Sequence, residues 1–193
     1  MRFEFAELAL CAECRRSCNA ARGCEVECET SYFGAVWRMR EVVEIRAART
    51  EDCERLALLF HELWPRVSAE EHGVEVRSLV QGTAKLTMPI AVLVAEWGSD
   101  GVVGFVEVDL RSHADGCDPA QAVGYIEGWY VAEEYRRTGV GTKLIAAAEA
   151  WARGFGCVEV GSDALIENEV SQRAHESLGF EVVDRCVHYR KRL

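Results

Sequence analysis

Hydrophobic and polar residues follow regular patterns from residue 42 to the end of the chain, and these patterns predict both strands and helices. An amphipathic stretch from Thr50 to Trp64 predicts the first helix, and Ser68 with Glu71 resembles a capping box for the second. The complete pattern predicts helices over 50–64, 68–81, 140–153 and 169–178, and strands over 42–46, 90–97, 102–110, 123–131, 158–160, 180–183 and 186–190.

The order of these elements is β, α, α, β, β, β, α, β, α, β, β. Two late β-α-β passages require right-handed crossovers, and the earlier strands follow one another without an intervening helix. This order predicts an α/β (α+β) fold, in which a mixed central sheet is covered by helices on both faces.

Residues 1–40 differ from the rest of the chain, because they show neither helical spacing nor sustained alternation. Five of the nine cysteines lie in the first 28 residues, and Cys11 and Cys14 form a C-x-x-C pair. One such pair supplies half of a zinc site, but a second pair is missing. We therefore expect a Cys-rich extension over 1–40 without a metal site, followed by one domain over 41–193.

Composition narrows the classes of partner. The chain has 193 residues, with 22 Lys+Arg against 32 Asp+Glu and a net charge of −10. Such an acidic chain suits a cationic partner better than nucleic acid or an anionic membrane surface. No apolar run is long enough to span a membrane, and residues 3–10 are too short and too acidic for an export signal. We expect a cytoplasmic protein without a disulfide framework.

The segment from 129 to 142 carries the clearest chemical signal. A strand ends here, a short loop with two arginines follows, and Gly139 and Gly141 lead into a helix. Glycines let backbone N–H groups approach an anion closely, and the start of a helix adds unpaired N–H donors. On spacing alone the segment is equally consistent with phosphate binding and with a plain connection between a strand and a helix.

The same segment resembles a known family. R-x-x-G-x-G at 136–141, after Trp-Tyr-Val, resembles the acetyl-CoA signature of the GNAT N-acetyltransferase superfamily. Asn168, followed by His175 and by Leu178-Gly179-Phe180, resembles the second motif of that family. Further matches at 63–65, 124–131 and 162–175 are similar to the aminoglycoside 6′-N-acetyltransferases, and the resemblance spans about residues 43–193.

The resemblance implies a GNAT fold, whose sheet is splayed between strands four and five. It implies that Trp129, Tyr130 and Val131 face the pantetheine arm of acetyl-CoA, with the Val131 N–H donating to the thioester carbonyl. Either aromatic residue has ordinary strand packing as its alternative role. The remaining residues implied to bind the co-substrate are Arg136, Arg137, Thr138, Gly139, Val140, Gly141 and Thr142 at the pyrophosphate and Asn168 at the CoA arm.

Acidic residues are expected on the acceptor side, because a polycationic substrate needs negative charge and its amine must lose a proton before it attacks. Glu127 lies inside an otherwise apolar strand, where an acid is costly unless it is paired or functional. The resemblance implies that Glu127 and Asp163 contact the aminoglycoside and assist deprotonation. It also matches Trp64 and Asp184 to acceptor-binding positions, and it places His113 where the family commonly has a tyrosine.

His175 occupies the position where many GNAT enzymes have a tyrosine that protonates the departing thiolate. A histidine serves that purpose near neutral pH, or it is a helix residue without a chemical role. Cys117, Cys157 and Cys186 have no spacing to a histidine that specifies a nucleophilic pair. We therefore expect direct transfer, without an acetyl-cysteine intermediate.

These expectations combine into an acetyl-CoA-dependent 6′-N-acetyltransferase that inactivates aminoglycosides and confers resistance, and that forms a homodimer. Two alternatives stay open. One is a GNAT enzyme that acts on a polyamine or a protein N-terminus, and the other is a CoA-binding module without catalytic activity.

Overall fold

The computed structural model describes residues 43–192. The extension predicted for residues 1–40 lies outside the described residues. The statements that follow concern residues 43–192.

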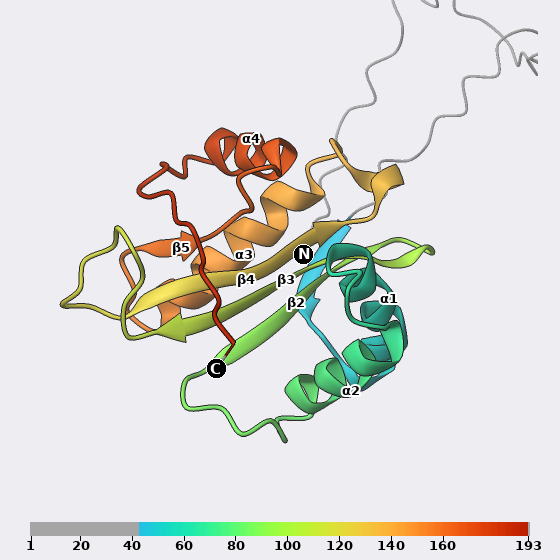
Figure 1. Ribbon diagram of the computed structural model, residues 1–193. Coiled ribbons are helices and arrows are strands. Elements are labelled where there is room, and N and C mark those ends of the chain that lie inside the picture. Colours follow the sequence, from blue (N-terminus) through green and yellow to red (C-terminus); the bar gives the residue numbers. More distant parts are fainter. Residues whose placement is uncertain (1–42, 193) are drawn as a thin grey trace, which may run out of the picture. The chain divides into compact units, whose positions relative to one another are not determined.

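A single sheet of five strands forms the centre of the fold, with the strands in chain order across it (Figure 1). Neighbouring strands are antiparallel except for the last pair, which is parallel. The pairing of β3 with β4 shifts register between Glu107 and Val108, so a bulge lies in the middle of the two longest strands. The strands are β1 (Val43–Ala47), β2 (Ile90–Trp97), β3 (Gly101–Arg111), β4 (Val123–Val131) and β5 (Val160–Ser162).

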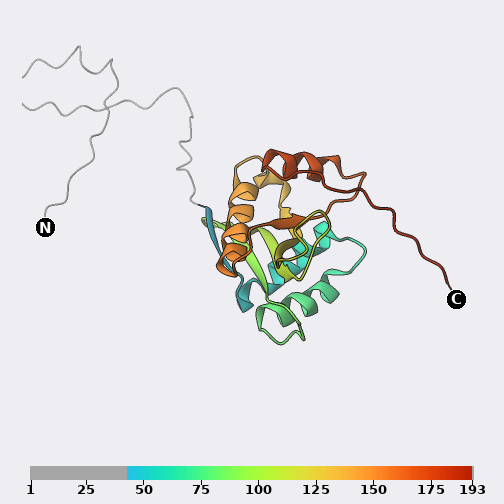
Figure 2. The same cartoon turned by 90° about the vertical axis from the view of Figure 1, so that its left-hand side faces the viewer.

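Helices cover both faces of this sheet, as predicted, and Figure 2 shows the sheet between them. The apolar faces of α1 (Cys53–Leu63) and α2 (Ala69–Val80) pack on one side, around Phe60 and Phe105. The apolar face of α3 (Val140–Gly154) packs on the other side, through residues such as Leu144 and Ile145, and α4 (Glu169–Ser177) lies beside it.

The local signals that predicted the helices act as expected. The Ser68 hydroxyl accepts a hydrogen bond from the Glu71 N–H at 3.2 Å, and the Glu71 carboxylate accepts one from the Ser68 N–H, which confirms the capping box. Thr50–Asp52 forms a short 3-10 turn (η2) before α1 instead of the first turn of that helix.

The sheet opens between β4 and β5. The two strands pair only at Gly124, Tyr125 and Ile126, whereas β4 continues to Val131. The edge of β4 from 127 to 131 therefore has no neighbouring strand on that side within the described part of the chain. This opening is the splay expected between strands four and five.

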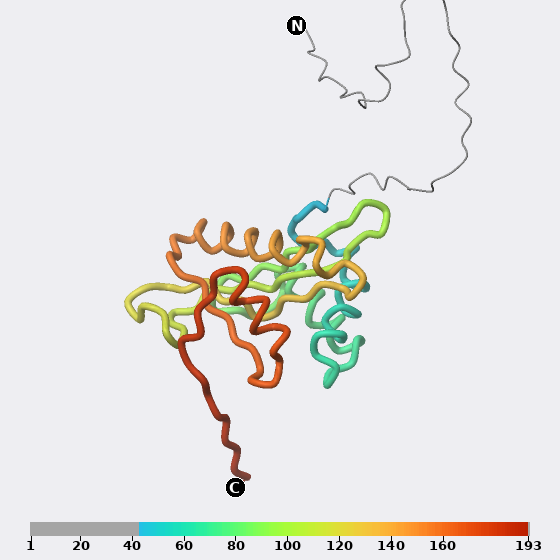
Figure 3. The backbone as a smooth tube through the Cα atoms, turned by 90° about the horizontal axis from the view of Figure 1, so that it is seen from above, coloured from blue at the N-terminus to red at the C-terminus, as the bar shows by residue number. Residues whose placement is uncertain are grey.

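The last two predicted strands, 180–183 and 186–190, are wrong. The structure assigns no strand to residues 180–192, and Figure 3 shows this segment running away from the sheet. Val183 is 62% exposed and Tyr189 92% exposed, so the apolar positions that suggested strands are not buried in this chain. Among the described residues, no helix has the length and apolar character that a membrane crossing requires.

Candidate active site

The loop after β4 presents backbone donors at the start of a helix. Gly139 has φ +90° and stands directly before α3, and no side chain caps that helix end. The N–H groups of the first turn therefore have no partner inside the helix and no side-chain acceptor. Arg137 also has a positive φ, 62°, so the loop is held in an unusual conformation. This arrangement fits a pyrophosphate, because its oxygens accept hydrogen bonds from such N–H groups.

Two other residues of this loop stabilise its shape. The Thr138 hydroxyl donates to the Tyr135 carbonyl at 2.6 Å, and the Arg136 guanidinium donates to the Val131 carbonyl at 2.9 Å. A second nitrogen of Arg136 donates to the Tyr130 hydroxyl at 3.1 Å. The Arg136 side chain is thus directed back to β4.

The open edge of β4 carries the predicted oxyanion donor. The Ala132 N–H donates to Val103 on the β3 side at 2.9 Å. Successive N–H groups of an extended chain point to opposite sides, so the Val131 N–H faces the open edge. The Val131 carbonyl, on the same side as its own N–H, is already occupied by Arg136. An acyl carbonyl placed along this edge would meet a free backbone donor at Val131.

Trp129 contacts both α3 and α4, at Gly141 and at His175. A Cβ atom on Gly141 would lie 2.8 Å from Cζ2 of Trp129, so the glycine allows the indole ring to pack against α3. The sequence analysis explained this glycine by the close approach of a phosphate to the backbone. Packing of Trp129 gives a second reason for a glycine at position 141. On the opposite face of the sheet, Tyr130 contacts the core under α1 and α2.

His175 and Asn168 already have partners in the fold. His175 Nδ1 lies 2.8 Å from the Ser171 carbonyl, and Nε2 lies 3.1 Å from the Ser162 hydroxyl. The imidazole ring also meets Trp129 edge-on, with the ring centroids 5.4 Å apart. The Asn168 side chain caps α4 by accepting from the Ser171 N–H at 3.1 Å. Their predicted roles in thiolate protonation and CoA binding stay predictions.

An acidic surface lies on the α1 and α2 side of the sheet, beyond Phe105. Alternation along β3 places Glu107, Asp109 and Arg111 on this side, next to Glu127 and Tyr125 of β4. We call these residues, together with Asp163 after β5, the acceptor face.

Hydrogen bonds and one cation–π contact link the two predicted acids of the acceptor face. The Arg111 guanidinium donates to Glu127 through Nε at 3.1 Å and through Nη2, and it lies 3.4 Å from the centroid of the Tyr125 ring. The Tyr125 hydroxyl donates to Asp163 at 3.1 Å. Glu127 and Asp163 are therefore linked indirectly, through Arg111 and Tyr125, which the sequence analysis did not single out.

Two further carboxylates of this face were also missed. Burial, followed by the negative charges of Glu75, Glu127 and Asp109, raises the pKa of Glu107 to about 7. Burial and the adjacent Glu127 raise the pKa of Asp109 to about 6. Alternation would have found both acids, because each interrupts the apolar run of β3 on the same side.

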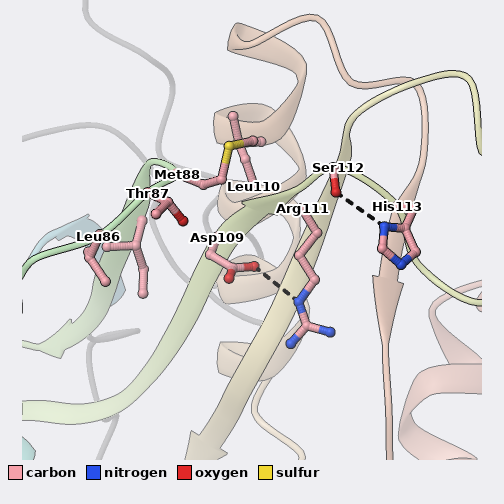
Figure 4. Close-up of a pocket in the computed structure, with 9 residues that line it drawn as sticks. Leu86, Thr87, Met88, Asp109, Leu110, Arg111, Ser112 and His113 are labelled. Carbon is pink, nitrogen blue, oxygen red and sulfur yellow. Dashed lines mark hydrogen bonds and ion pairs between the residues drawn. The ribbon is translucent and has the colours of Figure 1, made fainter.

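A cavity of about 400 Å³ opens beside the acceptor face (Figure 4). The segment 86–90 forms one wall, and the end of β3 with His113 forms the other. Asp109 and Arg111 lie side by side in this wall, with 3.7 Å between Arg111 Nε and Asp109 Oδ1. His113 also lines this cavity, and its Nδ1 lies 3.1 Å from the Ser112 hydroxyl.

Trp64 and Asp184 differ in their relation to this face. Trp64 packs against β4, where a Cβ atom on Gly128 would clash with its ring. Asp184 is exposed on the segment after α4, and its carboxylate accepts from the Arg185 N–H at 2.6 Å. The structure thus places Trp64 next to the acceptor face and shows no contact between Asp184 and the other acids.

Three of the four cysteines of the described region have buried or half-buried thiols, and Cys186 is exposed. Cys53 and Cys157 are buried, and burial raises the pKa of the Cys53 thiol. Burial also raises the pKa of Cys117, which disfavours its thiolate. These environments are consistent with the expected direct transfer.

Known proteins resemble this chain over most of its length. The family model described as the acetyltransferase (GNAT) family matches residues 54–180. Aminoglycoside N(6′)-acetyltransferase type 1 of Klebsiella aerogenes is 38% identical over 149 residues, which cover 77% of this chain and 96% of that enzyme. The enzyme of the same name from Serratia marcescens is 41% identical over 133 residues, covering 68% and 86% of the two chains.

A solved structure extends the comparison to three dimensions. AAC(6′)-Iy in complex with the bisubstrate analogue CoA-S-monomethyl-acetylneamine matches with a TM-score of 0.68 and 33% identity. The match covers 79% of this chain and 99% of that one.

Proposed function

The chain belongs to the GNAT family of acetyltransferases, and from this membership we propose that it transfers the acetyl group of acetyl-CoA to the 6′-amino group of aminoglycosides. The transfer neutralises an ammonium group of the antibiotic and so confers resistance. The observation that carries the proposal is the acceptor face itself, where several carboxylates gather beside the open edge of β4. The names and complexes of the relatives support both the co-substrate and the position of the reacting amine.

On the donor side, the first turn of α3 holds the pyrophosphate through backbone N–H groups, and the edge of β4 aligns the pantetheine arm. The Val131 N–H donates to the thioester carbonyl and stabilises the negative charge that develops on its oxygen. Acetyl-CoA supplies the activated acyl group. The chain contributes position and hydrogen bonds instead of a covalent attachment.

On the acceptor side, Glu127 and Asp163 bind ammonium groups, and one of the acceptor-face carboxylates takes the proton of the 6′-ammonium directly or through water. The neutral amine then attacks the carbonyl carbon, the nitrogen loses a second proton, and the carbon–sulfur bond breaks. The leaving thiolate takes up a proton, for which we propose His175. Its Nδ1 faces the Ser171 carbonyl, so the donating atom would be Nε2 beside Ser162.

The charge of the acceptor face favours a polycation over a protein N-terminus. A protein N-terminus presents one ammonium group, whereas the acceptor face offers carboxylates on three strands or their ends. A linear polyamine shares the charge but not the hydroxyl groups of an aminoglycoside. It stays the alternative that experiment must separate.

A thiol-release assay over aminoglycosides and polyamines tests the proposal. We expect turnover with aminoglycosides that carry a 6′-amino group and none with those that carry a 6′-hydroxyl. In Asp163→Asn, kcat/KM for the aminoglycoside should fall by roughly 10²–10⁴, while the dissociation constant of acetyl-CoA stays unchanged. Glu169→Gln, an exposed acid on α4, serves as the control. Efficient acetylation of polyamines alone would contradict the proposal.

We also propose a cytoplasmic homodimer that binds neither nucleic acid nor membranes. The net charge of −10 opposes binding to polyanions. The exposed apolar side chains of 180–192, among them Val187 and Tyr189, support a dimer because a second copy would cover them. Sedimentation of Tyr189→Asp against the unchanged protein tests this, and a dimer of equal affinity in both would contradict the suggested interface.

A further inference from the structure

We infer that Arg111 is an internal substitute for the substrate: its guanidinium occupies the ammonium position between Glu127 and Asp109, and an aminoglycoside must displace it. The inference rests on the proposed function and adds a residue that sets the affinity for the acceptor.

The contacts of Arg111 are those expected of a bound cation. Two of its nitrogens donate to the same Glu127 oxygen, and Nε lies 3.7 Å from Asp109 Oδ1. Its guanidinium also lies over the face of Tyr125, with 3.4 Å to the ring centroid. A carboxylate pair and an aromatic face together form the environment that proteins use for organic ammonium groups.

The position of Arg111 leaves it free to move. It is the last residue of β3, its side chain is 38% exposed, and it borders the cavity of about 400 Å³. The strand and bulge that hold Glu127 and Asp109 lie inside the sheet. Rotation of the Arg111 side chain would therefore vacate the position without disturbing the carboxylates.

An aminoglycoside also has a chemical advantage over Arg111 at this position. With Arg111 in place, the face around Glu127 and Asp109 is partly neutralised, and the free protein avoids burying uncompensated charge. An aminoglycoside carries several ammonium groups on a rigid frame, so it replaces the single charge of the Arg111 guanidinium by more than one positive charge. Arg111 therefore favours polycations over singly charged amines, because a single ammonium gains little by exchanging with a guanidinium.

The test removes the internal cation and then supplies it again. Arg111→Met keeps an unbranched apolar stem but removes the guanidinium over Tyr125 together with its charge, and Arg111→Lys is the matched control that keeps the charge. Isothermal titration of each protein with a 6′-amino aminoglycoside, in the absence of acetyl-CoA, should show binding about 5- to 50-fold tighter for Arg111→Met and an intermediate value for Arg111→Lys. The KM for acetyl-CoA should stay the same in all three proteins.

Methylguanidinium provides a readout that a merely structural role would not move. At millimolar concentrations it should refill the vacated position in Arg111→Met and raise the aminoglycoside KM towards the unsubstituted value, with kcat unchanged. The unsubstituted protein should not respond. Adding Glu127→Gln to Arg111→Met should abolish both the tighter binding and the response to methylguanidinium.

Weaker binding of the aminoglycoside by Arg111→Met would contradict the inference. If Arg111→Met binds the aminoglycoside more weakly and methylguanidinium restores binding, Arg111 holds Glu127 in place for the substrate and the inference is overturned. If Arg111→Met does not fold, Arg111→Lys decides, since tighter binding supports the inference and weaker binding contradicts it. The titrations use whichever polycation the unsubstituted protein acetylates. Absence of aminoglycoside turnover thus refutes the proposed function, while titration with the polycation that is acetylated still decides the role of Arg111.

Discussion

Glu107 is an unusual residue for the middle of a sheet. It is only 8% exposed, and three other carboxylates raise its pKa further than burial alone does. The folded chain therefore holds a proton on Glu107 between about pH 4.5 and 7, whereas the unfolded chain releases it. Because the folded state binds the extra proton, the contribution of Glu107 to stability falls as the pH rises through this window and is constant above it.

Replacing Glu107 with Gln should remove this dependence, because the amide does not titrate. We expect the loss in free energy of unfolding between pH 5 and pH 8 to be smaller in Glu107→Gln by about 3 kcal/mol. Urea unfolding at the two pH values measures it, and Glu44→Gln on β1 is the exposed control. Equal pH dependence in Glu107→Gln and the unsubstituted protein would show that Glu107 is ionised throughout.

At the level of elements, alternation and helical spacing predicted those that contribute to the core of this chain. Leu56, Leu59 and Phe60 form the buried face of α1 as expected, and β4 agrees with its prediction to the residue. The strand predicted at 158–160 lies instead at 160–162, where it finds β4 as a partner.

The wrong strands at 180–183 and 186–190 have a physical explanation. A strand needs a neighbour that accepts and donates hydrogen bonds, and alternation reports only that one side is apolar. Val183 and Tyr189 satisfy the alternation but pair with no strand in the described chain. The same limit explains why the sequence predicted only part of the site. Glu127 was predicted because it is a single acid in an apolar strand. Its contact with Arg111, and that of Arg111 with Tyr125, depend on the register between β3 and β4 and could not be predicted.

The start of α3 and the end of β4 depend on each other through Gly141. Gly141→Ala should raise the KM for acetyl-CoA at least about tenfold, because the new Cβ displaces Trp129 from the donor side, and should reduce stability by about 1–3 kcal/mol. Steady-state kinetics and thermal unfolding measure the two effects.

Gly154→Ala is the matched control, since it lies in the same helix with no atom within 4 Å of the added Cβ. It should leave the KM unchanged. An unchanged KM in a folded Gly141→Ala protein would contradict the assignment of the phosphate site.

At the scale of the whole molecule, the core of the described residues is formed from Val43 onward. Val43 is the first residue of the described core, and its contacts are to the sheet and α3. Deleting residues 1–40 should therefore change kcat/KM by no more than about twofold and the melting temperature by no more than about 3 °C. Loss of folding, or stoichiometric zinc in the full-length protein, would contradict the view of these residues as an extension without a metal site.

The opening between β4 and β5 has a consequence for how such an enzyme evolves. In the proposed function, the donor is held largely by peptide groups, at the edge of β4 and the first turn of α3, and a change of side chain leaves peptide groups in place. The acceptor is met in that proposal by side chains, such as Glu107, Asp109 and Arg111, which lie at alternate positions along β3. A single codon change can therefore alter which antibiotic is recognised while the acyl donor stays the same. Under selection by a new drug, substitutions should therefore accumulate on β3 and around the cavity, and the edge of β4 and the first turn of α3 should stay unchanged.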